Sequence, residues 1–245
     1  MWVLVLAAAV AGGLYHAGLL RLNFPSPERF PVRGIDISRH NGHVGWYEAS
    51  LHDVRFAYIK ATEGTDFRDP QFLYNWTQCP KDGVARGAYH FFNFCRPGKD
   101  QARNFLQSVP VDPVALPPAL DLEFSGNCHR IPTRAEVERE VSAFVKAIAG
   151  RYPGPPVFYA TQDFYQRYLD GHRNEFPPHR LWIRSVVKQP SPPPCTDSGW
   201  TFWQYSGLGR VPGVPGPVDL NVFCGSREQF AELSRQRRTS GPPVQ

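Results

Sequence analysis

Apolar residues in this chain fall into short runs separated by longer amphipathic or turn-rich stretches. Runs with a period of two, or continuous runs rich in β-branched and aromatic residues, predict eight β-strands. These strands are expected at Arg33–Ile37, Arg55–Ile59, Arg86–Phe92, Ala119–Phe124, Pro156–Ala160, Arg180–Arg184, Thr201–Tyr205 and Val218–Phe223. Helical patterns or turns separate the first six strands, whereas loops without a helical pattern join the last three.

The clearest predicted helix begins at Thr133. Thr133 and Glu136 form a T-x-x-E capping box, which marks a helix N-terminus. Apolar residues then recur on one helical face, at Val137, Val141, Phe144, Val145 and Ile148. Further helices are expected at Asp69–Cys79, Asp100–Val109, Gln162–Leu169 and Ser226–Gln236.

Five β-then-α units followed by three bare strands predict an α/β fold of one domain. The expected architecture is a closed or nearly closed parallel β/α barrel of about eight strands and roughly five helices. An open doubly wound sheet is the alternative, but no G-x-G-x-x-G or Walker-type loop follows any strand. The predicted divisions are an apolar segment and linker over 1–32, the barrel over 33–232, and a basic, Pro-rich tail over 233–245.

The N-terminal segment suggests export. Residues 2–20 contain no Lys, Arg, Asp or Glu, and about 20 such residues can span a bilayer. A cleavage site at Ala9-Val10-Ala11 would leave a very short apolar core, so an uncleaved anchor fits the length better. Basic residues follow the run instead of preceding it, which the positive-inside rule reads as a cytoplasmic C-terminus. The chemistry of the strand carboxylates outweighs this charge pattern. We therefore expect a protein that is secreted, or anchored through 2–20 and facing the periplasm or cell wall.

Composition excludes two classes of protein. Of 245 residues, 42% are apolar and 13% aromatic, enough for a sizeable core, which excludes a disordered chain. The 27 Lys and Arg residues exceed the 22 Asp and Glu residues by five, and this excess is spread along the chain without a basic stripe. We therefore expect that the protein does not bind nucleic acid. A monomer is also expected.

The five cysteines show no C-x-x-C spacing, which argues against a zinc or thioredoxin-like site. In an exported protein they could form up to two disulfides and leave at least one thiol. Cys95 and Cys128 follow adjacent predicted strands, so we expect them to form a disulfide at one rim of the barrel. His40 and His43 lie in a Gly-rich turn and are interpreted as solvated, so no metal or cofactor is expected.

Four carboxylates interrupt apolar strand patterns: Asp36, Asp121, Glu123 and Asp219. A lone buried carboxylate is costly, so such acids are usually paired or face a cleft. Asp121 and Glu123 are two residues apart and share one face of a strand. Neighbouring carboxylates resist ionising together, and a protonated acid beside a carboxylate is what glycosidic bond cleavage requires. Salt bridges to Lys60 or Arg184 are the alternative, but four acids on three strands favour a shared site at the carboxyl ends.

Aromatic residues on the strands provide a second indication. Sugars present flat C–H faces that lie against aromatic rings, although most strand aromatics belong to the core. Trp203 and Tyr205 are the best pair for sugar contact, because Gln204 adds an amide between them. The predicted substrate-binding residues are Tyr89, Tyr159, Trp203, Gln204 and Lys60.

These motifs resemble those of the glycoside hydrolase family 25 lysozymes across about residues 33 to 230. The matching segments are Gly34–Ser38, His40–Gly42, Phe56–Gly64, Asp69-Pro70, Arg86–Phe91, Leu116-Pro117, Leu120–Glu123, Trp200–Tyr205 and Val218–Asn221. The resemblance implies a flattened, irregular barrel that hydrolyses the β-1,4 bond between N-acetylmuramic acid and N-acetylglucosamine in peptidoglycan. No recognisable wall-binding repeat follows the barrel.

The resemblance also implies roles for the four acids. Glu123 corresponds to the general acid, and Asp121 to a partner that orients the muramic acetamido group or stabilises the oxocarbenium-like state. Asp36 and Asp219 would shape the hydrogen bonds and electrostatics of the site. Retaining, inverting and substrate-assisted mechanisms all remain open. So do three rival functions: hydrolysis of another N-acetylated glycan such as chitin, a silent wall-binding module, and an interaction domain without a glycan ligand.

Overall fold

The computed structural model describes residues 5, 6, 10, 12–14, 23–152, 154–191, 193–196 and 199–235. Most of the predicted anchor at 2–20 and of the predicted tail at 233–245 therefore lies outside the described residues. In the part that is described, no helix has both the length and the apolar character needed to cross a membrane.

Eight strands close into a barrel, because β1 pairs with both β9 and β2. Around the ring the order is β1-β9-β8-β7-β6-β5-β4-β2, and β3 extends the sheet beyond β2. The strands are β1 (Arg33–Ile37), β2 (Val54–Glu63), β3 (Phe67–Arg68), β4 (Ala85–Phe91), β5 (Ala119–Leu122), β6 (Val157–Ala160), β7 (Arg180–Arg184), β8 (Phe202–Gly209) and β9 (Val218–Phe223). The predicted α/β barrel is confirmed, and each predicted strand is present.

The direction of the last strand differs from the expected parallel arrangement. β9 is antiparallel to both of its neighbours, β1 and β8. Parallel neighbours need a crossover of roughly a dozen residues or more, whereas the short loop between Gly209 and Val218 can join antiparallel strands directly. The reversal has a consequence for the site. Asp219, at the start of β9, reaches the same rim of the barrel as the carboxyl ends of the other strands.

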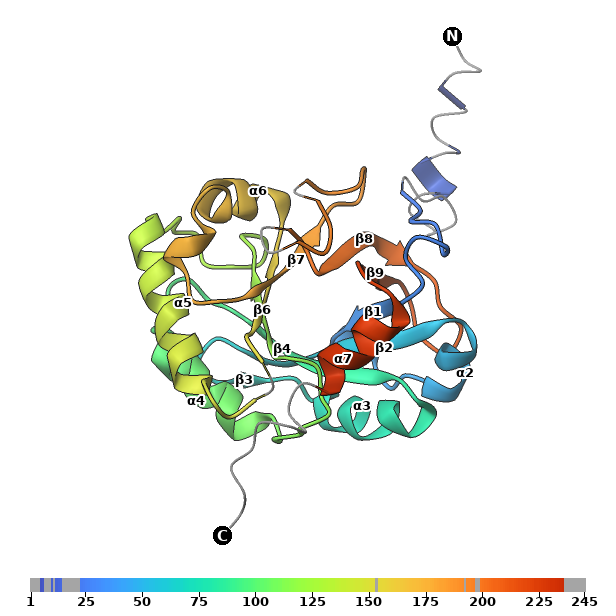
Figure 1. The fold of residues 1–245 in the computed structure, drawn as a ribbon, viewed down its shortest axis with the longest axis horizontal. Helices are drawn as coiled ribbons and strands as arrows, with labels where there is room; N and C mark the ends of the chain where they lie inside the picture. The colour runs from blue at the N-terminus through green and yellow to red at the C-terminus, as the bar shows by residue number, and fades with distance from the viewer. Residues whose placement is uncertain are drawn as a thin grey trace.

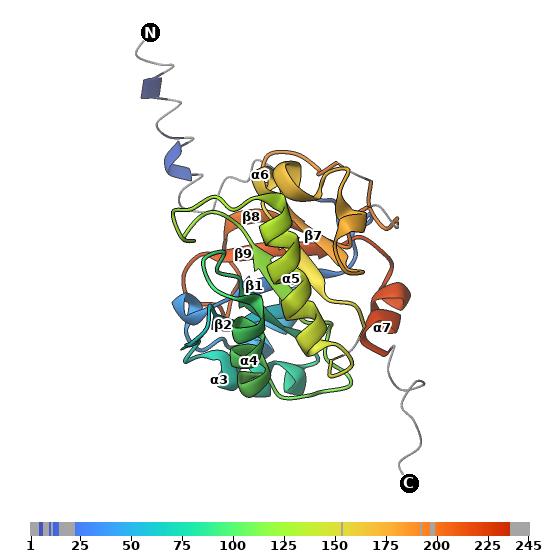
Figure 2. The same cartoon turned by 90° about the vertical axis from the view of Figure 1, so that its left-hand side faces the viewer.

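Helices cover the outside of the barrel on two flanks. α4 and α5 lie side by side on one flank, and α2 and α3 lie on the opposite one (Figure 1, Figure 2). The helices are α2 (Trp46–Leu51), α3 (Phe72–Gln78), α4 (Gly98–Ser108), α5 (Arg134–Ile148), α6 (Gln162–Phe164) and α7 (Arg227–Arg235), with a π-helical turn at Tyr165–Leu169 and 3-10 turns at Arg39–Asn41, Cys79–Asp82 and Arg173–Glu175. The predicted capping box is present at the start of α5: Thr133 and Glu136 each accept a hydrogen bond from the other's backbone N–H. Helix α2 was not predicted.

The barrel interior is filled at the amino ends of the strands. Phe56, Phe202 and Phe223 point inward there, and Phe230 of α7 packs on Phe56 and Phe223 with ring centroids 5.5 and 5.3 Å apart. Gly34 leaves room for this layer, because a Cβ at that position would collide with Phe56. α7 thus closes the amino end of the barrel, which leaves the carboxyl end for an open site.

Candidate active site

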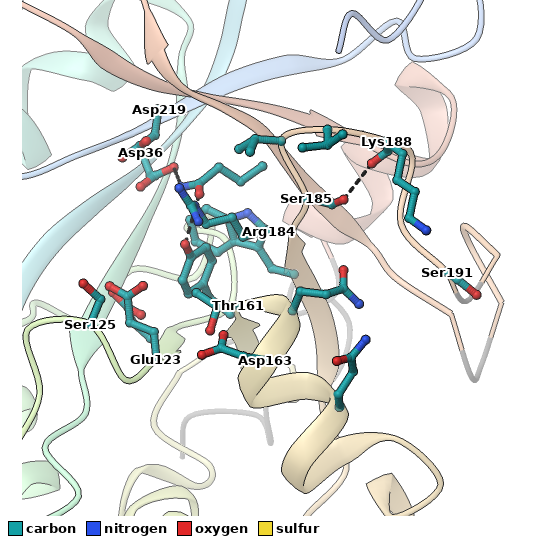
Figure 3. A pocket seen from close by; sticks show the side chains of 18 of the residues that line it. Asp36, Glu123, Ser125, Thr161, Asp163, Arg184, Ser185, Lys188, Ser191 and Asp219 are labelled. Atoms are coloured by element: carbon teal, nitrogen blue, oxygen red, sulfur yellow. Dashed lines mark hydrogen bonds between the residues drawn. The ribbon is translucent and has the colours of Figure 1, made fainter. Parts of the chain in front are cut away.

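A cavity of about 870 Å³ opens at the carboxyl ends of the strands. All four carboxylates singled out from the sequence line it. Figure 3 labels three of them, Asp36, Glu123 and Asp219. Asp36 comes from β1, Asp121 from β5, Glu123 from the residue after β5, and Asp219 from β9. The remaining lining residues are Tyr89, Ser125, Tyr159, Thr161, Gln162, Asp163, Gln166, Trp182, Arg184, Ser185, Val186, Val187, Lys188, Ser191 and Gln204.

The alternation of side chains along each strand explains why these residues meet. Successive residues of a strand point to opposite faces. On β5, Asp121 faces the cavity while Leu120 and Leu122 are buried in the outer core cluster. On β7, Trp182 and Arg184 line the cavity, whereas Leu181 and Ile183 belong to that outer core.

A directed network of hydrogen bonds holds Asp36 in place. Asp36 Oδ2 accepts bonds from Gln204 Nε2 at 2.9 Å and from Asn221 Nδ2 at 2.7 Å. Gln204 Oε1 accepts the Tyr159 hydroxyl at 3.0 Å, and Asn221 Oδ1 accepts Trp182 Nε1 at 2.9 Å. Because an indole N–H can only donate, it fixes the orientation of the Asn221 amide, so that Nδ2 points at Asp36.

Asp36 and Asp219 form a pair across β1 and β9, where they are direct neighbours in the antiparallel register. Burial raises the pKa of both carboxyls. The hydrogen bonds from Asn221 and Gln204 oppose that rise at Asp36, whereas the charge of Asp36 adds to it at Asp219. A hydrogen bond between two carboxyls needs a proton on one of them, and the two amide N–H donors on Asp36 favour its ionised form, so Asp219 is the partner that keeps its proton.

Asp121 and Glu123 form the second pair. Burial raises the pKa of Glu123 to about 7. Burial, followed by the charge of Glu123, raises the pKa of Asp121 well above its usual range. Asp121 Oδ1 is buried and has no hydrogen-bond partner among the described residues. This pair therefore combines an acid that is protonated near neutral pH with an oxygen that is available to accept a hydrogen bond.

The loop that carries Glu123 is tied to the loop after β4. Asn127 Nδ2 donates to Glu123 O at 3.0 Å and to Phe92 O at 2.7 Å. The predicted disulfide between Cys95 and Cys128 is confirmed, with a Cα–Cα distance of 6.1 Å. These links join the two loops at the rim of the cavity and restrain the backbone that positions Glu123.

The sequence and the fold match those of known glycosyl hydrolases. The sequence model described as glycosyl hydrolases family 25 matches residues 35–214. Lysozyme M1 of Streptomyces globisporus is 32% identical over 213 residues, which cover 83% of this chain and 71% of that protein. The YegX protein of Escherichia coli O6:H1 is 36% identical over 209 residues, covering 83% and 74%.

A solved family 25 glycosyl hydrolase from Bacillus anthracis superimposes with a TM-score of 0.77 and 35% identity, covering 87% of this chain and 97% of that one. The chain belongs to glycosyl hydrolase family 25. It is therefore a glycoside hydrolase, and its cavity lies where barrel enzymes place their active sites.

The structure brings most of the expected substrate-binding residues of this family 25 enzyme to the cavity. Tyr89, Tyr159 and Gln204 line it. Trp203 does not, because it follows Phe202 on β8 and points to the outer face: it is 1% exposed, packs on Trp200 and donates its Nε1 proton to Ser185 O at 2.8 Å. The expectation that Trp203 contacts substrate is not supported by this position.

Lys60 also lies beside the cavity lining and not within it. Its ammonium pairs with Glu63 at 2.7 Å and lies 4.8 Å from the Phe91 ring centroid. The positive charge of Lys60 still lowers the pKa of Asp121 and of Glu123, which partly offsets the rise caused by burial. Lys60 therefore influences the site through its charge and not as part of the cavity lining.

Sequence reasoning missed several lining residues. It also missed Asn221, which does not line the cavity but donates to Asp36; counting two residues on from Asp219 would have found it, since both side chains then face the barrel interior. Asp163 lies in the short helix α6, and Gln166 lies in the π-helical turn that follows it. No strand pattern indicates either residue. Lys188 lies in a loop, where alternation gives no information.

Two further observations concern cysteines and histidines. A second disulfide, Cys195–Cys224, has a Cα–Cα distance of 5.6 Å, and Cys79 remains a buried thiol. His43 stacks on Tyr74 with centroids 3.7 Å apart. Over the described ranges, no group of three or more His, Cys, Asp or Glu side chains could hold a metal ion.

Proposed function

We propose that this family 25 enzyme hydrolyses the β-1,4 bond between N-acetylmuramic acid and N-acetylglucosamine in peptidoglycan. The observation that carries the proposal is the Asp121–Glu123 pair in an open cavity, with the pKa of Glu123 raised to about 7. The similarity to a lysozyme of Streptomyces globisporus supports the choice of substrate.

Glu123 is proposed as the general acid. A group with a pKa near 7 is both protonated often enough and acidic enough to deliver a proton near neutral pH. Its proton would pass to the glycosidic oxygen as the bond from that oxygen to the anomeric carbon breaks. The leaving sugar then departs as a neutral alcohol.

Asp121 is proposed to orient the acetamido group of the muramic residue. Its buried Oδ1 has no hydrogen-bond partner in the described part of the chain, so it can accept the acetamido N–H. The acetamido oxygen would then attack its own anomeric carbon and form a cyclic oxazolinium intermediate. Water, deprotonated by Glu123, would open this ring and restore the acid. The configuration at the new anomeric centre would be retained.

The remaining residues are proposed to shape the site around these two acids. Asp36, held by Gln204 and Asn221, supplies negative charge near the developing oxocarbenium ion, and Asp219 supports it through their shared hydrogen bond. The rings of Tyr89 and Tyr159 are proposed to contact the sugars.

The test is digestion of purified sacculi, with mass spectrometry of the released muropeptides. We expect products with N-acetylmuramic acid at the reducing end, formed initially as the β-anomer, and no release by a folded Glu123→Gln variant. Chitin is digested in parallel. Equal turnover of chitin would support the other N-acetylated glycan as substrate, and binding to sacculi without release of reducing ends would identify a wall-binding module.

We further propose that the enzyme works as an exported monomer. Two disulfides support an oxidising compartment, since cytosolic thiols are kept reduced. Fractionation of cells that express the full chain is the test, and recovery of the folded protein in the cytosol would contradict export. Size-exclusion chromatography with light scattering tests the monomer.

A further inference from the structure

Two cations line one wall of the acidic cavity. Arg184 is the last residue of β7 and faces the cavity with Trp182, and Lys188 follows in the next loop. Ser185 Oγ donates to Lys188 O at 2.7 Å, which closes the turn that carries Lys188 (Figure 3). Both side chains belong to exposed residues. This wall is therefore positively charged, in a site whose other charged lining residues are carboxylates.

The guanidinium of Arg184 lies near acidic residues but is not paired with any of those described. A Cβ placed on Gly207 would lie 3.3 Å from Asp219 Oδ1 and 3.9 Å from Arg184 Nη2, so the guanidinium extends over β8 toward Asp219. Among the described residues, however, Arg184 makes no hydrogen bond and no ion pair within 4.0 Å. Asp36 instead accepts hydrogen bonds from the amides of Gln204 and Asn221 and shares one with Asp219.

A guanidinium in this position can bind a ligand anion. Its donors form a planar fork that matches the two oxygens of a carboxylate. The cavity around it is partly enclosed, which weakens screening by solvent relative to an open surface. Lys188 adds a second positive charge on the same wall, and Val186 and Val187 line the cavity between the two cations.

The proposed substrate carries an anion where a neutral glycan carries none. N-acetylmuramic acid differs from N-acetylglucosamine by a lactyl ether, which ends in a carboxyl that is free or amide-linked to a peptide with carboxylates of its own. We propose that Arg184 and Lys188 form a subsite for a carboxylate on this muramic side chain, and that the subsite selects peptidoglycan over neutral N-acetylated glycans. The proposal rests on the proposed function.

The test compares kcat/KM on three soluble glycan-strand preparations. The first carries peptides, the second has been stripped of peptides by an amidase so that lactyl carboxylates are free, and the third has had its carboxylates converted to amides. For the wild-type enzyme we expect about a tenfold or larger loss on the amidated strands, the range for a hydrogen bond to a charged group. If kcat/KM on the amidated strands is lower than on the peptide-bearing strands only, the recognised group is a peptide carboxylate. If it is also lower than on the stripped strands, the recognised group is the lactyl carboxylate.

Variants assign this discrimination to the two cations. Arg184→Gln should reduce the ratio between charged and amidated strands to within about threefold, and Lys188→Gln should reduce it partly. Arg103→Gln removes the same charge from the exposed outer side of α4 and should leave the ratio unchanged. Because Arg184 also lowers the pKa of Glu123, its absolute rate can change, but the ratio compares cleavage of the same bond in the same variant.

The outcomes separate this subsite from the proposed function. Full wild-type discrimination in Arg184→Gln and Lys188→Gln would overturn the subsite, even if sacculi are digested as expected. If the wild-type enzyme cleaves no strand, the proposed function fails, and calorimetry with free N-acetylmuramic acid and N-acetylglucosamine still decides the subsite. Preference for N-acetylmuramic acid that is lost in Arg184→Gln would support it, and equal affinity for both sugars would overturn it.

Discussion

Glu123→Gln should inactivate the enzyme and also stabilise its fold, because one structural feature causes both effects. The Glu123 carboxyl lies beside Asp121 in a partly enclosed cavity, and burial raises its pKa from 4.5 to about 7. Gln keeps the size of the side chain and its capacity for hydrogen bonds but has no acidic proton. Losing a general acid costs about 10²–10⁴-fold in rate.

The expected stabilisation follows from the pKa shift. A carboxyl whose pKa is higher in the folded state than in the unfolded state is penalised once it ionises. The penalty is absent below pH 4.5, grows as the pH rises, and is complete above the folded pKa of about 7. At 1.36 kcal/mol per pKa unit, a shift of this size corresponds to about 3 kcal/mol. For a domain of this size that is roughly 6–12 °C in Tm.

The assay is urea unfolding of wild type and Glu123→Gln at pH 4.5 and pH 8 with disulfides intact. The free energy of unfolding of the variant should exceed that of wild type by about 3 kcal/mol at pH 8 and by much less at pH 4.5. Glu48→Gln, on the exposed start of α2, is the matched control and should show no such pH-dependent gain. An unchanged difference at the two pH values would refute the raised pKa, and folded Glu123→Gln with more than about a tenth of wild-type activity would refute its role as the acid.

Three further predictions concern the fold around the site. Burial lowers the pKa of His90 to about 4, so its neutral form stabilises the fold above pH 6.5, and about 3 kcal/mol should be lost as the pH falls to 4. A His90→Asn variant should lack this loss in urea unfolding at pH 7 and 4, and an equal loss in both proteins would contradict the shift. Replacing Cys95 and Cys128 with Ser should cost about 3–4 kcal/mol, and an unchanged urea midpoint would argue against the disulfide. Trp203→Ala should cost about 3–5 kcal/mol of stability without raising KM, and a raised KM at unchanged stability would return Trp203 to the binding site.

The strands and the strongest helix were predictable because their signals are local. β1, β7 and β9 have the predicted bounds, since each is a short apolar run between turn residues. α5 begins after its capping box at Thr133, as expected. Helix α2 was missed because six residues give too few turns for a periodic pattern.

The partners of each side chain were harder to predict. Trp203 and Gln204 are adjacent in sequence, and the sequence pattern does not say which face of β8 is inside the barrel. The closed sheet decides this: Gln204 reaches Asp36, and Trp203 packs on Trp200. The Cys195–Cys224 disulfide was missed for a similar reason. Cys195 lies within the long loop between β7 and β8, and no local pattern places that loop beside the end of β9.

Alternating polarity along β1, β5 and β9 is a property of neighbouring residues, so the sequence was sufficient to identify Asp36, Asp121, Glu123 and Asp219 as carboxylates that face a cleft. Their chemistry depends on atoms from distant parts of the chain. The reversed direction of β9 brings Asp219 to Asp36, and closure of the barrel withdraws both pairs from water. The pKa of Glu123 near 7 arises from that desolvation and from charges on other strands, and neither exists until the barrel has closed.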